Sequence, residues 1–287
     1  MIAAMFLRPY TTFSPANRRM LAILVISHLG WSLLLLTCWS LGQLIDTALP
    51  WWSLLFVAVQ LFAAAQLLLP ALRLHPEERN RSFYLFWGVV FATSIWLLGQ
   101  LVPAPGWQPL LTVIRAGLLM LVATLIGAAL ARYVHRLWEV VPICVVMTLA
   151  DFASYLYGPT ALFTEVIERY YLAPEGPPPL IDMILVKLAF PGPAGLAPVF
   201  GISDWIMVVF FAIVARRHGI NDNLLGTPGE LVARRGGVGR YLPVSVLALF
   251  LAMVLAITSG LFIPALPLIA LVMLSWYGVR LTLLRQP

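Results

Sequence analysis

Two stretches decide how this chain folds: Leu-Ala-Asp-Phe at residues 149–152 and Phe-Gly-Ile-Ser-Asp-Trp at residues 200–205. Each places an aspartate, Asp151 or Asp204, inside an otherwise uncharged apolar run. A carboxylate at membrane depth costs several kcal/mol unless it faces a partner or a water-filled cavity. The two stretches therefore predict apolar helices that meet at a polar site.

The composition supports this reading. The chain is 61% hydrophobic and only 10% charged, and its mean hydropathy is +0.93, whereas soluble domains carry roughly 25% charged residues. These values exclude a soluble protein and predict one that crosses the membrane several times. The net charge of +6 does not indicate nucleic-acid binding, because most basic residues flank apolar runs, as topology signals do.

The apolar runs predict the number of membrane spans, since a helix needs about 20 apolar residues to cross the hydrocarbon core. We predict an all-α, polytopic bundle of about eight transmembrane helices. The long uncharged run from 241 to 279 is divided in two at Pro264–Pro267, because two prolines cannot both lie in a helix interior. The other six spans are predicted near 20–44, 51–72, 83–102, 110–132, 136–157 and 198–216.

The loops predict the orientation of the spans, because cytoplasmic loops collect Lys and Arg. Basic loops alternate with neutral ones, which places both termini and residues 216–240 in the cytoplasm and residues 158–197 outside a cell membrane. Asp151 then lies about six residues before the outer end of its span, and Asp204 about six after the start of its own. At 1.5 Å per residue, both would lie roughly 9 Å below the exterior boundary and face each other.

Two carboxylates at close range in a low-dielectric site share one proton, so that one is an acid while the other is a base. Such a pair can activate water and protonate a leaving amine. Two other readings remain open at this point. Each aspartate can satisfy a helix-packing hydrogen bond, and paired carboxylates also relay protons in transporters.

Three stretches resemble one known family. Residues 151–159, Gly-Ile-Ser-Asp at 201–204 and Pro-Ala-Leu at 264–266 are similar, in order and spacing, to the motifs of the presenilin and signal peptide peptidase superfamily of intramembrane aspartyl proteases. The resemblance covers roughly residues 137–284. Ala150 stands where the family has a tyrosine, and Ser203 where it has the second glycine of its Gly-x-Gly-Asp motif.

The resemblance implies an aspartic endopeptidase that cleaves transmembrane peptides or proteins in the lipid bilayer, oriented like signal peptide peptidase. It needs no cofactor and no metal, and nucleic acid is not a partner. Residues 1–132 would form a four-helix scaffold and residues 133–287 the catalytic half. Prepilin-type aspartyl peptidases, which have a cytoplasmic active site and no proline motif, and a transporter or non-catalytic scaffold are the alternatives. Asp151 and Asp204 would be the catalytic pair, and the substrate-binding residues would be Gly201, Ser203, Pro264, Ala265 and Leu266.

Two segments of the long exterior connection carry further predictions. Residues 160–171 are predicted to form an amphipathic helix at the membrane surface. Residues 180–190 resemble the family segment that pairs with an extended substrate, but a short buried helix is an equal alternative, because periodicity does not separate the two. His28 is expected to be a packed, hydrogen-bonded core residue, and Cys38 and Cys144 are expected to be unpaired core residues.

Overall fold

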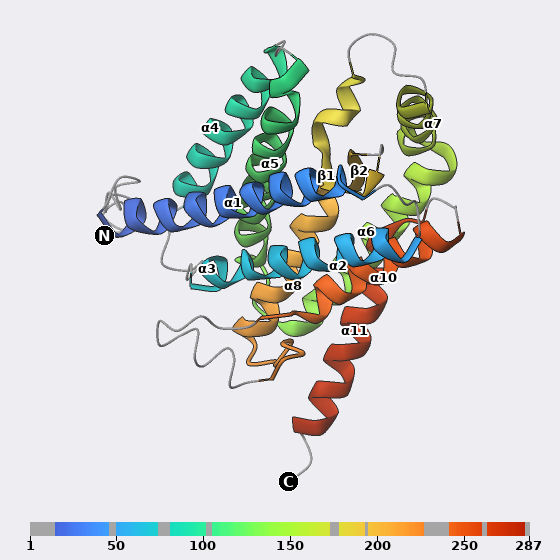
Figure 1. The fold of residues 1–287 in the computed structure, drawn as a ribbon. Coiled ribbons are helices and arrows are strands. Elements are labelled where there is room, and N and C mark those ends of the chain that lie inside the picture. Colours follow the sequence, from blue (N-terminus) through green and yellow to red (C-terminus); the bar gives the residue numbers. More distant parts are fainter. Residues whose placement is uncertain are drawn as a thin grey trace.

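The computed structural model describes residues 15–45, 50–73, 81–101, 105–172, 178–192, 195–226, 241–259 and 263–284. These residues are mostly helical, with one two-stranded sheet (Figure 1). The first half holds α1 (Pro15–Gly42), α2 (Pro50–Gln66), α3 (Leu68–Arg73), α4 (Arg81–Gln100) and α5 (Gln108–Ala131). The second half holds α6 (Val140–Tyr157), α7 (Pro159–Leu172), α8 (Ile202–Arg217), α10 (Val244–Ser259) and α11 (Ala265–Leu284).

The helix lengths make the chain a multi-pass membrane protein. In the described ranges, six helices are long and apolar enough to cross a membrane: Asn17–Gly42, Trp51–Leu72, Ser82–Gln100, Gln108–Ala131, Leu137–Tyr157 and Ala265–Thr282. All six agree with predicted spans. The other two predicted spans correspond to α8 and α10, which have 16 residues each and are shorter than the roughly 20 that a full crossing needs.

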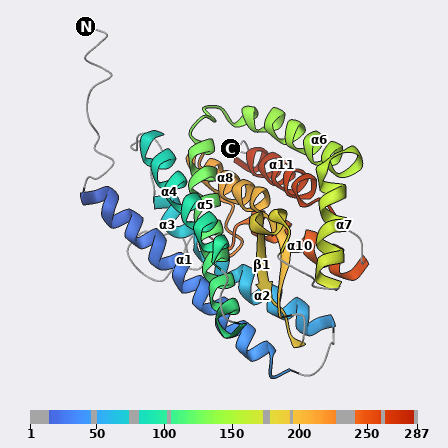
Figure 2. The ribbon, with the colours of Figure 1, turned by 90° about the horizontal axis from the view of Figure 1, so that it is seen from above.

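The core is built around α8. Its residues are buried almost continuously from Trp205 to Ala215, as expected for a helix that is hydrophobic on all sides. It packs most extensively against α5, and α1 and α4 cover the other faces of α5 (Figure 2). The close approach depends on Gly127 of α5, because a Cβ there would lie 2.6 Å from the carbonyl oxygen of Ile206.

Helix ends that the sequence assigns to one side of the membrane lie together. Arg217, at the end of α8, donates a hydrogen bond to the carbonyl of Ala131 at the end of α5 (3.3 Å). Gln66, at the end of α2, donates to the carbonyl of Tyr241, just before α10 (2.7 Å). Both contacts join helix ends that the sequence predicts on the cytoplasmic side, and the orientation of the chain in a membrane stays a prediction.

A β-hairpin precedes α8. Strand β1 (Leu185–Ala189) pairs antiparallel with β2 (Leu196–Gly201), and Leu185 lies opposite Gly201. The outer edge of β1 is covered by Gln60 of α2, whose buried amide both accepts from the Ala189 N–H (2.8 Å) and donates to the Ala189 carbonyl (2.9 Å). Gln60 thus replaces a neighbouring strand at this edge.

The hairpin corrects one sequence prediction and resolves another. Residues 198–201 were predicted as the start of a helix, but they are extended, and α8 begins only at Ile202. Asp204 therefore lies in the first turn of its helix instead of six residues into the span. Residues 180–190 were expected to be either a strand or a short buried helix, and they contain both: a short 3-10 helix, η4 (Leu180–Ile184), is followed by strand β1.

Several smaller predictions are confirmed. The amphipathic segment is helix α7, from Pro159 to Leu172. His28 is buried and its Nδ1 lies 2.7 Å from the Leu24 carbonyl oxygen, which makes it a satisfied core residue. Cys38 and Cys144 are both free and buried. The proline motif differs slightly from its prediction, because Pro267 lies inside the first turn of α11 and only Pro264 precedes the helix.

Candidate active site

The two aspartates line one cavity. It has a volume of about 340 Å³, and Asp151 reaches it from α6 while Asp204 reaches it from the start of α8. Four of the five residues expected to bind substrate also line it: Gly201, Ser203, Pro264 and Ala265. Residues from three separate stretches of sequence thus surround one space, as the motif positions predict.

Asp204 is fixed by its place at the start of α8. It is the third residue of the helix, and its Oδ2 accepts a hydrogen bond from the backbone N–H of Gly201 at 2.9 Å. This is the return half of a capping box, and a negative charge is favoured at a helix N-terminus. The carboxylate is half-buried and also borders the cavity.

The next residue, Trp205, ties this turn to the core. Its side chain is fully buried, and its indole N–H donates to the Thr124 hydroxyl of α5 at 3.2 Å. The same hydroxyl lies 3.3 Å from Nε2 of His28 on α1. The Thr124 hydroxyl donates its own proton to the Met120 carbonyl within α5 (2.8 Å), so Trp205 and His28 both lie against one polar atom of α5.

Asp151 is bound to the proline motif. Its carboxylate lies beside the backbone N–H of Leu266 and interacts with it, and Leu266 lies in the first turn of α11. Backbone N–H groups in a first helical turn have no partner within the helix, and they favour a negative charge placed near them. The fifth expected residue, Leu266, thus contacts the site through its backbone, while its side chain packs against the core.

The cavity walls include residues that the sequence reasoning missed. Helix α10 contributes Leu249, Ala252, Met253 and Ala256. Their spacing of three and four residues places them on one face of the helix, but α10 is apolar on nearly all sides, so the sequence does not distinguish this face. Strand β2 contributes Pro198, Val199 and Phe200, which no helical periodicity would have indicated.

Asp182 is a second acidic residue that the sequence reasoning did not single out. It is only 2% exposed, and it accepts hydrogen bonds from the Tyr171 hydroxyl (2.9 Å) and from Nζ of Lys187 (2.6 Å). Burial lowers the pKa of Lys187, and the charge of Asp182 opposes that shift. Burial and the Asp182 charge both raise the pKa of Tyr171.

The arrangement at the two carboxylates is suited to acid–base chemistry. Asp151 and Asp204 both line the cavity and interact electrostatically. Asp204 is held by the backbone N–H of Gly201, and Asp151 lies beside the backbone N–H of Leu266. Within the described ranges, no group of three or more His, Cys, Asp or Glu side chains is placed to hold a metal ion.

No protein-family model, curated protein or solved structure matches the chain. The family resemblance therefore rests on the three motif stretches alone.

Proposed function

We propose that the chain is an intramembrane aspartyl protease that hydrolyses peptide bonds within or near transmembrane segments. One observation carries the proposal: two aspartates on separate apolar helices line a single cavity, and the Pro264–Ala265 segment borders it. The cavity of about 340 Å³ has room for a few side chains of an extended peptide. The motif resemblance to presenilins and signal peptide peptidases supports the same assignment.

The two carboxylates act as one unit that holds one proton. The ionised carboxylate takes a proton from water as the water oxygen attacks the scissile carbonyl carbon. The protonated carboxyl gives its proton to the peptide nitrogen as the C–N bond breaks. The products are a carboxylic acid and an amine, and the pair again holds one proton.

The hairpin offers a place for an extended substrate. Gln60 already occupies the outer edge of β1, while β2 lines the cavity and ends at Gly201, three residues before Asp204. We propose that a substrate segment adds to the open edge of β2 as an additional strand. A scissile bond held in this extended form is free of helical hydrogen bonds and open to attack by water.

The proposal includes the predicted topology. We propose eight crossings in a cell membrane, in which β2 completes the short crossing of α8, because six extended residues add roughly 20 Å. Both termini are cytoplasmic, the segment 158–197 is exterior, and the orientation is that of signal peptide peptidase. Both catalytic aspartates then belong to the half of the chain from 133 to 287. Lipid surrounds the bundle.

Two other functions make different predictions. A proton-coupled transporter would also place paired carboxylates in a cavity, but it would move a solute and cleave nothing. A prepilin-type peptidase would cut on the cytoplasmic side. The Pro264–Ala265 segment at the cavity favours the presenilin-like reading over both.

The decisive experiment incubates the purified full chain in proteoliposomes with a panel of transmembrane peptides. Asp151→Asn and Asp204→Asn should each abolish cleavage, because each carboxylate needs the other to hold the shared proton. Asp222→Asn is the matched control, since Asp222 is buried against Tyr241, away from the cavity. Substantial cleavage by either cavity variant would overturn the proposal, as would a wild type that cleaves none of the peptides.

A further inference from the structure

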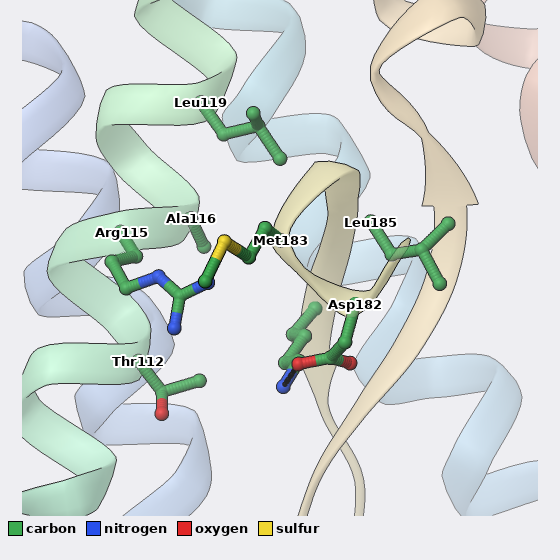
Figure 3. Close-up of a pocket in the computed structure, with 8 residues that line it drawn as sticks. Thr112, Arg115, Ala116, Leu119, Asp182, Met183 and Leu185 are labelled. Atoms are coloured by element: carbon green, nitrogen blue, oxygen red, sulfur yellow. Dashed lines mark hydrogen bonds and ion pairs between the residues drawn. The ribbon is translucent and has the colours of Figure 1, made fainter. Parts of the chain in front are cut away.

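Asp182 is the centre of a buried polar cluster behind the proposed active site. It binds Tyr171 of α7 and Lys187 of β1, and the side chain of Lys187 is only 15% exposed. Figure 3 shows Arg115 of α5 directed toward the same region from the opposite side. Two cations and one anion thus meet at the junction of α5, α7, η4 and β1.

The small cavity within this cluster is not a ligand site. It has a volume of about 10 Å³ and is lined by Thr112, Arg115, Asp182, Met183 and Lys187, among others. That volume is about the space of one water molecule. The cluster therefore acts on the elements that it joins.

Those elements form one wall of the large cavity. Ile167 of α7, Ile181 and Ile184 of η4, and Leu185 of β1 all line it. Leu185 and Lys187 lie two residues apart in a strand and so share one face. Asp182, itself part of η4, thus binds α7 and β1, the other two elements that place these apolar side chains against the cavity.

We propose that Asp182 is a positioning residue that holds this outer wall at the width at which the substrate binds. The expected effect of Asp182 on cleavage rests on the proposed protease function. Its effect on the width of the cavity does not, because the width is independent of catalysis. Removing one partner of a buried ion pair leaves an uncompensated charge, which is costly. Without the charge of Asp182, Lys187 and Arg115 repel each other, Tyr171 loses its acceptor, and α7, η4 and β1 are no longer held together, so the wall loosens.

The test measures access to the cavity directly. A single cysteine replaces Ala256, which lines the cavity, in a chain where Cys38 and Cys144 are changed to alanine. The rate of labelling by a water-soluble maleimide is then measured in detergent. Asp182→Asn and Lys187→Met should each raise this rate about tenfold or more. The double variant should label more slowly than Lys187→Met, because it no longer buries an unpaired carboxylate.

The matched control is Glu165→Gln. Glu165 forms an ion pair of similar length with Arg169 on α7 (2.7 Å), but both side chains are largely exposed, at 66% and 76%. Exposed pairs contribute little, so the labelling rate should stay within twofold. Tyr171→Phe removes a single hydroxyl from the cluster and is the milder variant to use if Asp182→Asn does not fold. It should raise the labelling rate severalfold.

Cleavage kinetics supply a second measurement. A wider cavity should raise the KM of a transmembrane peptide about tenfold while kcat changes less than threefold. Unchanged labelling in a folded Asp182→Asn or Tyr171→Phe variant would overturn the positioning role, as would an equal rise in Glu165→Gln. Increased labelling without any cleavage by the wild type would leave the positioning role standing and reject the protease.

Discussion

The carboxylate of Asp151 lies beside the backbone N–H of Leu266 and interacts with it. The first aspartate thereby lies at the start of α11, and Asp204 is fixed to the start of α8 by a hydrogen bond from the N–H of Gly201. The proline motif thus has a structural task that does not depend on the leucine side chain. This distinction can be tested, because backbone and side chain are altered by different substitutions.

Leu266→Pro removes the N–H while proline remains acceptable in the first turn of a helix. We expect cleavage to fall at least tenfold, because Asp151 loses the donor that orients it. Leu266→Ala keeps the N–H and should lose less than threefold. Peptide cleavage with a thermal unfolding midpoint for each variant measures the difference, and equal losses in the two variants would contradict the backbone role.

The close contact between Gly127 and Ile206 predicts a stability effect. In Gly127→Ala, the new Cβ would lie 2.6 Å from a backbone oxygen, so α8 must move away from α5. We expect a destabilisation of about 1–3 kcal/mol, seen as a lower Tm in detergent. Gly88→Ala on α4 is the control, because its Cβ would meet nothing within 4 Å, and a similar fall in both variants would disprove the packing argument.

Gln60 should be essential for the hairpin. Gln60→Leu keeps the approximate volume but leaves the N–H and carbonyl of Ala189 unpaired in a buried place. An unsatisfied buried group costs roughly 1–3 kcal/mol, so hydrogen exchange at β1 should accelerate. The exposed Gln100 gives a control, Gln100→Leu, in which exchange at β1 should be unaffected.

The cavity should select substrates by size. Ala252→Phe adds a ring to the wall at a residue that is only 2% exposed. Peptides with bulky residues at the scissile bond should be cleaved about tenfold more slowly, and peptides with alanine there should be less affected. Leu251→Phe, on the exposed side of α10, should leave the preference unchanged, and a shift in that variant would argue against selection by this cavity.

Cleavage should depend on pH from both sides. At low pH both carboxyls are protonated and no base remains, and at high pH both are ionised and no acid remains. The rate should therefore pass through a maximum, measured as kcat/KM across a buffer series with the folded state checked at each pH. A rate that rises steadily with pH would point to a single general base instead of a pair.

Much of the site was predictable because its signals are local. Asp151, Asp204 and Pro264 each interrupt an apolar run, and burying charge or breaking a helix has a cost that can be read at one position. The boundaries of six spans follow from run length for the same reason. The amphipathic segment at 160–171 is also a local pattern, and helix α7 confirms it.

The remaining features depend on partners distant in sequence. Residues 198–201 look apolar enough to continue a helix, but they pair with residues 185–187 as a strand, and no local pattern reports that pairing. Asp182 looks like an ordinary loop acid until Tyr171 approaches it from α7. Gln60 looks like an isolated polar residue in a span, and only the edge of β1 explains it.

Helix α6 has a consequence for the environment in which the protein works. It packs chiefly against α11 and α7, and much of its surface, including Val145, Val146 and Leu149, is exposed. Lipid chains therefore supply much of the lateral support of the helix that carries Asp151. Bilayers of different thickness tilt such a helix to different degrees. The separation of the two carboxylates is then set partly by the lipid, which makes the membrane itself a determinant of the geometry of the site.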